Sequence, residues 1–488
     1  AASDVYKRQV SKEYAPNDDM RDDFDPKFLS VLDKKSFNIR GIWGAGDLTF
    51  HEYPEQSGIF YGYSYAYIRN ANDIRLFASL SERAGYTIIT FNANASTVSV
   101  KKDLEGVTYK KGQEITLLEL CDIIDNIDNA FDKYFEEAKI DKPRAKRMCG
   151  YTTWYNYYTS VTEEIVERDL EAIAKLGSKI DIFQVDDGYE RTVGDWLYHD
   201  EKKFPSGMKL IADNIHKNDM LAGLWLAPFA ATPKSYIYNK HKDWFVKNKN
   251  GKIPFASHNW GGFYALDIYN NEVRQYLKEV FDTVLNVWGY DMVKLDFLYA
   301  CCIIPFNGKS RGEIMCDAMD LIRELCGDKL ILGCGVPIAP AFGKVDFCRI
   351  GADMALSWGK KPFSREDVST KHALLNTIFR RELDGRAFLN DPDVFLLRDN
   401  NIKMSFEQRK LIAETASLFG NLLFVSDDVS TYNSNQKDCF INVTTRNKAD
   451  INYVNMDSDG DISIKYTLDG EKKGYCFNIN SGDKKVLI

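Results

Sequence analysis

The chain has 488 residues, more than one ordinary domain holds, which predicts two or three domains. Hydrophobic residues make up 44% and charged residues 27%, as in ordinary globular proteins. No apolar run reaches the roughly 18–20 residues of a membrane span, so no membrane partner is expected. The net charge of -8 argues against a nucleic-acid partner, whose phosphates require a basic surface.

The cysteines and the first residues indicate the compartment and the state of the N-terminus. The ten cysteines are scattered, with no CxxC pair and no Cys/His spacing typical of zinc. We therefore expect reduced thiols and a cytoplasmic location. The opening run AASDVYKRQ, residues 1–9, contains what translation of a transposon sequencing adapter would give. We interpret it as an assembly scar and expect the true N-terminus to be missing.

Residues 10–142 are predicted to form a partial N-terminal β-sandwich. Between about residues 37 and 116, short alternating runs such as SGIFYGYSYAYIR, YTIITFNA and STVSVKK are separated by Gly, Asn and Asp turns, which favours antiparallel sheet. The following run LLELCDIIDNIDNAFDKYFEEAK has apolar residues at helical spacing and predicts a helix over 117–139. Pro143 ends this part of the chain.

Residues 143–430 are predicted to form a (β/α)8 barrel, because short apolar strands alternate there with amphipathic helices. The predicted strands are RMCGYTTW, KIDIFQVDDGYE, LAGLWLAPF, DMVKLDFL, KLILGCGVP, VDFCRIGAD, RAFLNDPDV and LLFVSDD. The predicted helices include VTEEIVERDLEAIAKLG, EVRQYLKEVFDTVLNVWG and IMCDAMDLIRELCG. A long insertion, residues 231–268, follows the third strand, and the link IAPAFGK is too short for a full helix. Residues 431–488 are predicted to form a small antiparallel β-domain with DCFINVTT and GYCFNIN as strands.

Carboxylates gather at the predicted C-terminal ends of the strands, where such barrels place their active sites. One such aspartate is more often a helix cap or a turn residue, but five strands end this way. These residues are Asp186, Asp187, Asp296, Asp353, Asp391, Asp393, Asp427 and Asp428. A pocket ringed with acids could hold a divalent metal, form a Schiff base at Lys294, or cleave glycosidic bonds with paired carboxylates.

The stretch MVKLDFLYA places Lys294 and Asp296 on the same face of one strand, because side chains alternate along a strand. Retaining glycoside hydrolysis needs one ionised carboxylate as nucleophile and one carboxyl group that keeps a proton for the leaving oxygen. A lysine beside the nucleophile helps to hold it charged. The sequence offers two pairs of this kind, Lys294 with Asp296 and Arg349 with Asp353.

Nine runs in this part of the chain resemble the α-galactosidases of glycoside hydrolase family 36, in the clan shared with family 27. In order, they are GYTTWYNYY, FQVDDGYE with GDWL, KFPSGMKLIADNIH, GLWLAPF, NWGGFYALD, VKLDFLYA, GCGVPIAP, CRIGADMALSW and FLNDPDVFLLR. Together they cover roughly residues 147–428. The resemblance implies a melibiase-like, retaining, exo-acting hydrolase of terminal α-linked galactose, which needs no cofactor or metal. Its substrates would be α-galactoside oligosaccharides of the raffinose or melibiose type, and the protein could be a homo-oligomer.

The resemblance also implies residue roles. Asp296 falls on the nucleophile and Asp353 on the acid/base. Substrate binding is assigned to Asp186 and Asp187 at O4 and O6, Lys294 near O3 and O4, Arg349, Cys334 at O2, and the tryptophans Trp154, Trp225, Trp260 and Trp196. For Trp154, Trp225 and Trp260, packing in the core is an equal alternative to stacking on the sugar. Asp391 and Asp393 are expected to support the pocket floor or to cap the following helix rather than to react.

Several alternatives remain open at this point. The loop GCGVPIAPAFGK is shorter than in many bacterial members and shapes the O2 side, so an α-N-acetylgalactosaminidase is possible. A transglycosylase of the raffinose-synthase kind would use the same scaffold. From other classes, the chain could be a Schiff-base enzyme acting through Lys294, a metal-dependent barrel enzyme, or a sugar-binding barrel without activity.

Overall fold

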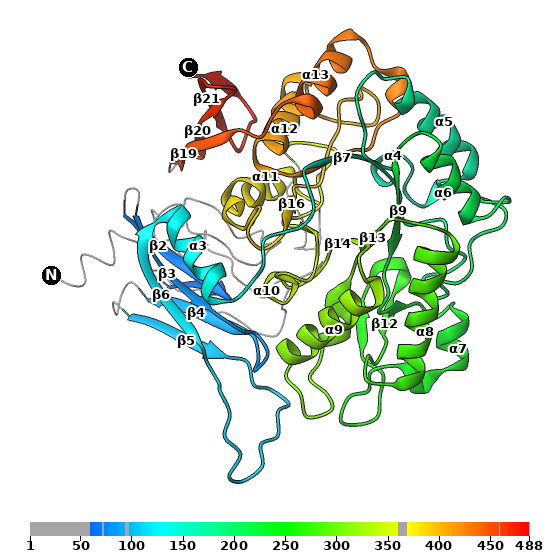
Figure 1. The fold of residues 1–488 in the computed structure, drawn as a ribbon, viewed down its shortest axis with the longest axis vertical. Coiled ribbons are helices and arrows are strands. Elements are labelled where there is room, and N and C mark those ends of the chain that lie inside the picture. The colour runs from blue at the N-terminus through cyan, green and yellow to red at the C-terminus, as the bar shows by residue number, and fades with distance from the viewer. Residues whose placement is uncertain (1–58, 71–72, 93–96, 360–367, 458, 488) are drawn as a thin grey trace.

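The computed structural model describes residues 59–70, 73–92, 97–359, 368–457 and 459–487. Residues 1–9, which we expect to be an assembly scar, and the predicted sheet residues before Ile59 lie outside the described residues. Figure 1 shows a β-sandwich, a large barrel and a small C-terminal sheet in succession along the chain. Among the described residues, no helix is both long enough and apolar enough to cross a bilayer.

The sandwich consists of two three-stranded antiparallel sheets, with strand orders β1-β4-β5 and β2-β3-β6. The strands are β1 (Ile59–Tyr63), β2 (Tyr65–Asn70), β3 (Asp73–Ser79), β4 (Thr87–Asn92), β5 (Thr97–Lys102) and β6 (Leu120–Asn126). Ser64, with φ 58°, separates β1 from β2 and lets one predicted run supply a strand to each sheet. The rings of Phe77 and Phe91 meet between the sheets, with centroids 5.8 Å apart. The predicted antiparallel sheet is confirmed over this range.

The helix predicted over residues 117–139 is wrong for its first part and confirmed for its second part. Residues Leu120–Asn126 pair with β3 as strand β6, and only Ile127–Glu137 form a helix, α3. The run LCDII alternates, with Cys121 and Ile123 buried and Asp122 and Ile124 exposed, which is the period of a strand. The side chain of Asn126 caps α3 by accepting a hydrogen bond from the backbone N–H of Asn129 at 3.0 Å, which fixes where the helix begins.

The predicted barrel is confirmed, as a parallel sheet with strand order β16-β15-β14-β13-β9-β8-β7-β18-β17. The strands are β7 (Met148–Thr152), β8 (Ile182–Val185), β9 (Leu221–Leu226), β13 (Met292–Leu295), β14 (Leu330–Gly333), β15 (Phe347–Arg349), β16 (Leu389–Asp391), β17 (Val394–Phe395) and β18 (Leu422–Val425). Each of the eight runs predicted as strands contains one of these strands, and the seventh also reaches the first residue of β17.

The seventh strand is split because Pro392 has no N–H to donate and Asp393 has φ 74°. β16 pairs with β15, whereas β17 pairs with β18, so the two halves of one strand join the two edges of the sheet. The strand ladder thereby continues around the barrel.

Helices follow the strands and cover the barrel (Figure 1). They are α5 (Glu163–Ala174), α6 (Met208–His216), α8 (Asn271–Asp282), α9 (Arg311–Cys326), α10 (Ile338–Ala341), α11 (Thr370–Phe379) and α12 (Phe406–Phe419). The three predicted helices are confirmed as α5, α8 and α9, with α8 continuing as a π-helical turn over Thr283–Val287. The link predicted to be too short for a full helix holds only α10.

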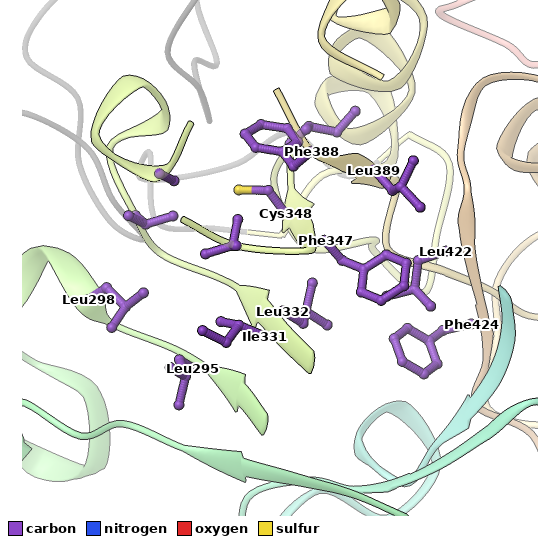
Figure 2. Close-up of a cluster of buried hydrophobic side chains, with 14 of the residues drawn as sticks. Leu295, Leu298, Ile331, Leu332, Phe347, Cys348, Phe388, Leu389, Leu422 and Phe424 are labelled. Atoms are coloured by element: carbon purple, nitrogen blue, oxygen red, sulfur yellow. The ribbon is translucent and has the colours of Figure 1, made fainter. Parts of the chain in front are cut away.

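Large apolar side chains from neighbouring strands fill the barrel beneath its mouth, as Figure 2 shows for Leu332, Phe347, Leu389 and Phe424. Gly150 faces this packing, because a Cβ at that position would lie 2.3 Å from the ring of Phe424. The core therefore supports the strand ends from below, in the manner of packed barrel interiors.

The predicted insertion after the third strand forms a small antiparallel sheet of order β10-β12-β11 beside the barrel. Its elements are β10 (Ala230–Ala231), α7 (Tyr236–Lys240), β11 (Phe255–Ser257) and β12 (Phe263–Ala265). A short helical turn, Asn259–Gly261, joins β11 to β12 and carries Trp260 in the left-handed region, with φ 55°.

The strand predicted at DCFINVTT is wrong, because the run lies in helix α13 (Ser434–Thr445). A reciprocal cap between Asn433 and Gln436 begins the helix, and Cys439, Phe440 and Val443 form its buried face. The hydroxyl of Ser417 in α12 donates to the carbonyl of Val443 at 2.8 Å. This helix follows the eighth strand and packs on α12, so the C-terminal sheet begins only after it.

That sheet has the order β19-β20-β21-β22 and includes the predicted run GYCFNIN in β21. Its strands are β19 (Asp450–Met456), β20 (Asp461–Leu468), β21 (Glu471–Asn478) and β22 (Lys484–Val486). The ring nitrogen of Trp358 donates to the carbonyl of Ile479 at 3.1 Å, which ties the sheet to the loop after β15.

Close backbone contact joins the sandwich to the barrel at the start of α9. The guanidinium of Arg311 contacts Asp103 at 2.9 Å and Glu105 at 2.8 Å. Beside it, a Cβ on Gly312 would lie 2.6 Å from the backbone nitrogen of Tyr86. Only glycine permits this approach, since backbone atoms cannot move aside as a side chain can.

We predict that Gly312→Ala lowers the free energy of unfolding by about 1–3 kcal/mol, the usual cost of overpacking. In an exposed helix interior, the same change would stabilise the protein by about 1 kcal/mol. Glu324→Ala, on the exposed face of α9, is the matched control and should leave the melting temperature nearly unchanged. Calorimetry measures both, and an unchanged or higher melting temperature for Gly312→Ala would contradict the close contact.

Candidate active site

A cavity of about 260 Å³ opens at the C-terminal ends of the barrel strands. It is lined by Trp154, Tyr155, Thr159, Asp186, Asp187, Trp225, Asn259, Trp260, Lys294, Asp296, Phe297 and Asp353. Eight of these twelve residues were predicted from the sequence as site residues. The lining combines carboxylates, one ammonium group and aromatic rings, which come from β9, β13, the insertion and the segments that follow β7, β8, β13 and β15.

The ammonium group of Lys294 is buried and donates to Asp186 Oδ2 at 2.8 Å. Gln184 donates to the same oxygen at 2.9 Å, and the backbone N–H of Asp187 donates to Oδ1. Burial alone would raise the pKa of Asp186, but Lys294 and these donors hold it below its usual value. Burial likewise opposes the charge of Lys294, and the attraction of Asp186 raises its pKa above the ordinary value. Both groups are therefore charged at neutral pH.

Asp296 directly follows β13 and lines the cavity, and its carboxylate accepts hydrogen bonds from two donors. The ring nitrogen of Trp225 donates to Oδ2 at 3.2 Å, and the backbone N–H of Phe297 donates to Oδ1 at 2.8 Å. Burial raises the pKa of Asp296, with Lys294 opposing this and Asp353 adding to it. The sequence paired Lys294 with Asp296, but the hydrogen-bond partner of the lysine is Asp186. Lys294 acts on Asp296 through its charge.

The guanidinium of Arg349 contacts three carboxylates at once. Nη1 donates to Asp353 Oδ1 at 2.7 Å, Nε to Asp391 Oδ2 at 3.2 Å, and Nη2 contacts Asp393 Oδ1 at 2.7 Å. The planar fork of arginine matches such an arrangement, whereas a lysine would offer a single point charge. The predicted pairing of Arg349 with Asp353 is present. The side chain of Asp353 is 46% exposed toward the cavity, whereas Asp391 and Asp393 are fully buried.

Asp391 and Asp393 lie under the mouth and touch Arg349 rather than the cavity. Asp393 Oδ2 also accepts from the hydroxyl of Tyr155 and from the backbone N–H of Met354. Burial raises the pKa of Asp393 to about 7, although Arg349 acts against this. Tyr155 lines the cavity, so this carboxylate positions two groups of the site, the Arg349 guanidinium and the Tyr155 ring.

Asp187 forms the wall next to the insertion. The ring nitrogen of Trp260 donates to Asp187 Oδ2 at 2.8 Å. Burial is the main cause that raises the pKa of Asp187, and the negative charges of Asp186 and Asp296 add to it. The insertion thus contributes a hydrogen bond to the barrel mouth and closes one side of the cavity.

The four predicted tryptophans have different surroundings. Trp154, Trp225 and Trp260 line the cavity. The ring of Trp225 lies between those of Trp196 and Trp260, with centroids 5.8 and 5.9 Å away. Trp196 is fully buried behind Trp225, so the structure places it as packing support and not on the cavity wall.

Cys334 is buried beside the charged groups, at the end of β14, and does not line the cavity. Its backbone N–H donates to the carbonyl of Leu295 at 2.8 Å. The next residue, Gly335, has φ 55°, and a Cβ there would lie 3.1 Å from Asp296 Oδ1 and 2.9 Å from the nitrogen of Phe297. Glycine at this position leaves room for the carboxylate that the sequence assigns as nucleophile.

Two strand-end carboxylates of the sequence prediction belong to the scaffold. Asp427 is buried, pairs with Arg398 at 2.8 Å and accepts from the hydroxyl of Tyr432. Asp428 begins a short helical turn by accepting from the backbone N–H of Ser430. Asp428 thus has the cap role that single strand-end aspartates usually have, whereas Asp427 is a buried partner of Arg398.

Sequence reasoning missed several residues that shape the site: Thr152, Tyr155, Thr159, Gln184, Asn259 and Phe297. Tyr155 and Gln184 lie inside runs that carry the resemblance, but their types alone suggest core packing. Asn259 reaches the cavity only through the course of the insertion, which local sequence does not specify. Among the described residues, no three or more His, Cys, Asp or Glu side chains are grouped so as to hold a metal ion.

The fold and the site together define a (β/α)8 barrel with carboxylates and aromatic rings around a cavity at its C-terminal mouth. A family model described as Melibiase matches residues 108–308. The α-galactosidase Mel36A of Lactobacillus acidophilus is 25% identical over 259 residues, which cover 51% of this chain and 34% of that protein. An α-galactosidase of Escherichia coli is 23% identical over 239 residues, 46% of this chain and 32% of that protein.

Solved structures share the fold. TtGalA, an α-galactosidase from Thermus thermophilus in complex with p-nitrophenyl α-D-galactopyranoside, has a TM-score of 0.70 at 24% identity, covering 89% of this chain and 86% of that one. A variant of the α-galactosidase AgaA from Geobacillus stearothermophilus, in complex with raffinose, has a TM-score of 0.60 at 14% identity, covering 89% and 66%. The chain spans about a third of the length of the curated relatives named above. The chain is thus similar in sequence to α-galactosidases over part of its length and shares the fold of solved α-galactosidases.

We predict that Lys294→Met lowers the free energy of unfolding at pH 7 by about 3–5 kcal/mol, because it leaves Asp186 as a buried charge without its partner. The paired carboxylate stabilises the wild type above its unfolded pKa of about 3.9, and this stabilisation is lost as the pH falls below that value. The difference between variant and wild type should therefore shrink below pH 4.

Lys209→Met is the matched control, because Lys209 pairs with Asp213 on an exposed helix face and such a pair contributes about 0.5 kcal/mol or less. Urea denaturation at pH 7 and at pH 3.5 measures all three proteins. A pH-independent loss for Lys294→Met, equal to that of the control, would contradict the charged pair.

Proposed function

We propose that this protein is a retaining, exo-acting α-galactosidase that removes terminal α-linked galactose from oligosaccharides of the raffinose or melibiose type. The observation that carries the proposal is that Asp296 and Asp353 face one cavity from different environments. Asp296 is fixed by two N–H donors, whereas Asp353 is half-exposed and contacts a single arginine nitrogen. One acid is thus positioned to attack and the other to exchange protons with the substrate and water.

Double displacement would use these residues as follows. Asp296 attacks the anomeric carbon and forms a galactosyl ester, while Asp353 gives its proton to the leaving oxygen. Water then enters, Asp353 takes a proton from it, and the ester at Asp296 is cleaved with net retention. Trp225 and the N–H of Phe297 keep the attacking carboxylate in place, and Arg349 orients Asp353.

The other lining residues would recognise the sugar. Asp186 and Asp187 offer carboxylate oxygens to the hydroxyls at O4 and O6, and Lys294 offers a donor near O3 and O4. A sugar without the axial hydroxyl would leave a buried acceptor unpaired, which disfavours it. Trp154 and Trp260 supply flat apolar faces beside these groups. Cys334 and Arg349 lie behind the wall, so their effect on the O2 side would be indirect.

Two alternatives use the same site. Transglycosylation would require a sugar acceptor in place of water, and α-N-acetylgalactosaminidase activity would require space near O2. The described side chains favour neither over hydrolysis of galactosides. A Schiff base at Lys294 is disfavoured, because the nitrogen is charged and bound to Asp186.

Asp296→Asn should abolish turnover of every α-galactoside, because the nucleophile is lost. Asp353→Asn should slow substrates with poor leaving groups by about 10²–10⁴-fold, and activated aryl galactosides far less, because only poor leaving groups need a proton. Asp428→Asn, a strand-end aspartate that caps a turn, should retain activity. Steady-state kinetics on raffinose and on an activated aryl galactoside measure these effects. Equal losses on both substrates in Asp353→Asn would contradict its role as acid.

The wild type should release the chromophore from p-nitrophenyl α-galactoside, and NMR should show α-galactose as the first product. Addition of sucrose as acceptor should leave hydrolysis the main reaction. Release only from the N-acetylgalactosaminide would overturn the assignment to galactosides, and β-galactose as the first product would overturn retention.

A further inference from the structure

Arg349 contacts Asp353 in a way that opposes the role proposed for this aspartate. A group that protonates a leaving oxygen has to hold a proton before the reaction. The guanidinium Nη1 donates to Asp353 Oδ1 at 2.7 Å, and a cation this close favours the ionised carboxylate. Among the described residues, Arg349 is the one cation that forms an ion pair with Asp353. The positive charge of Arg349 therefore has to be balanced if Asp353 is to act as an acid.

Two buried carboxyl groups contact the other nitrogen atoms of the same guanidinium. Asp391 Oδ2 accepts from Nε at 3.2 Å, and Asp393 Oδ1 lies 2.7 Å from Nη2. Their second oxygens also face donors, since Asp391 Oδ1 accepts from the N–H of Asp393 at 2.9 Å and Asp393 Oδ2 accepts from the N–H of Met354 at 2.7 Å. Oxygens that only accept match ionised carboxylates. Both side chains, which do not line the cavity, thus place negative charge beside Arg349.

The pKa of Asp393 adds a dependence on pH to this balance. Burial raises that pKa to about 7, against the attraction of Arg349. The charge of Asp393 therefore becomes complete only as the pH rises above neutral. A negative charge that appears there opposes the ionisation of a neighbouring carboxyl group, so it helps Asp353 to keep its proton.

Asp353 is the carboxyl group of this cluster that a substrate can reach. Its side chain is 46% exposed, whereas those of Asp391 and Asp393 are fully buried. A sugar bound in the cavity would cover Asp353 and remove water from it, which favours the protonated form. An unbalanced guanidinium would act against this effect.

The other charges around the cluster leave this balance in place. The ammonium of Lys294 is bound to Asp186 at 2.8 Å, so its charge is neutralised there. Asp296, the proposed nucleophile, carries the same sign of charge as an ionised Asp353 and opposes its formation. The titratable groups that face the cluster or stand in the first turn of α11 beside it are Tyr155, Lys294, Asp296, Cys334, Cys348 and His372.

We propose that Asp391 and Asp393 are positioning residues that act through Arg349: they balance its charge, so that the guanidinium holds Asp353 in place without holding it ionised. The inference rests on the proposed function, in which Asp353 is the acid. Arg349 can then fix the direction of the Asp353 side chain while the proton stays available to the leaving oxygen.

The pH dependence of kcat/KM for raffinose tests this role. Asp391→Asn and Asp393→Asn each remove one negative charge and keep the size of the side chain. The guanidinium then favours ionised Asp353 more strongly, so the alkaline limb of the profile should move about one pH unit toward acid. The profile for p-nitrophenyl α-galactoside, whose leaving group needs no proton, should show no such shift. Either variant alone carries the test if the other does not fold.

Asp346→Asn is the matched control. Asp346 is also buried and contacts two arginines, Arg144 at 2.8 Å and Arg323 at 3.1 Å, but it stands at the opposite end of β15 from Arg349. Its variant should keep the wild-type alkaline limb. An unchanged limb in Asp391→Asn and Asp393→Asn, a loss that is equal at every pH, or an equal shift in the control would overturn the inference.

Carboxyl ¹³C NMR of protein labelled at its aspartates tests the charge balance independently of activity. The signal of Asp353, identified by its absence from Asp353→Asn, should titrate at lower pH in Asp391→Asn than in the wild type. If the protein cleaved no α-galactoside, the proposed function would fail, while the NMR titration would still decide the charge balance. An Asp353 signal that titrates at the same pH in both proteins would overturn it.

Discussion

The ion pair between Lys294 and Asp186 is the interaction on which the arrangement of the barrel mouth depends. Asp186, Asp187, Asp296 and Asp353 bring four acidic side chains to one cavity, and their mutual repulsion would otherwise drive them apart or protonate them. The lysine neutralises the most deeply buried of them, and its positive charge favours the ionised form of Asp296. The carboxylate that we propose as nucleophile can then remain ionised in a largely enclosed site beside a second acid.

The location of this cavity could be predicted from the sequence, because it depends only on which residues stand at the ends of the strands. Parallel strands end at one face of a barrel, so aspartates at strand ends converge there, and the spacing of Lys294 and Asp296 puts both on one side of β13. The partner of the lysine was not predictable in this way. It is set by the sheet order β13-β9-β8, which lets the Lys294 side chain reach across β9 to Asp186.

The errors have similar causes. Residues 120–126 and 434–445 both contain apolar residues that fit more than one period, and tertiary pairing or capping decides between strand and helix. Residues 120–126 form a strand because β3 is beside them as a partner. Residues 434–445 form a helix because a reciprocal cap begins it and α12 offers a surface to pack on. Trp196 illustrates another limit. Its run GDWL is part of the resemblance, yet the side chain supports the site through Trp225 rather than facing the cavity.

The cavity is lined partly by the barrel and partly by the insertion of residues 231–268. The carboxyl groups proposed to react follow the barrel strands, whereas the wall beside Asp187 is completed by Trp260, which lies in a left-handed turn outside the barrel sheet. Sequence change in this small sheet can therefore reshape one wall of the cavity while the strands beneath Asp296 are preserved. The residues proposed to react and those that shape the wall of the cavity thus lie on different elements. Natural or laboratory evolution could therefore change one set without changing the other.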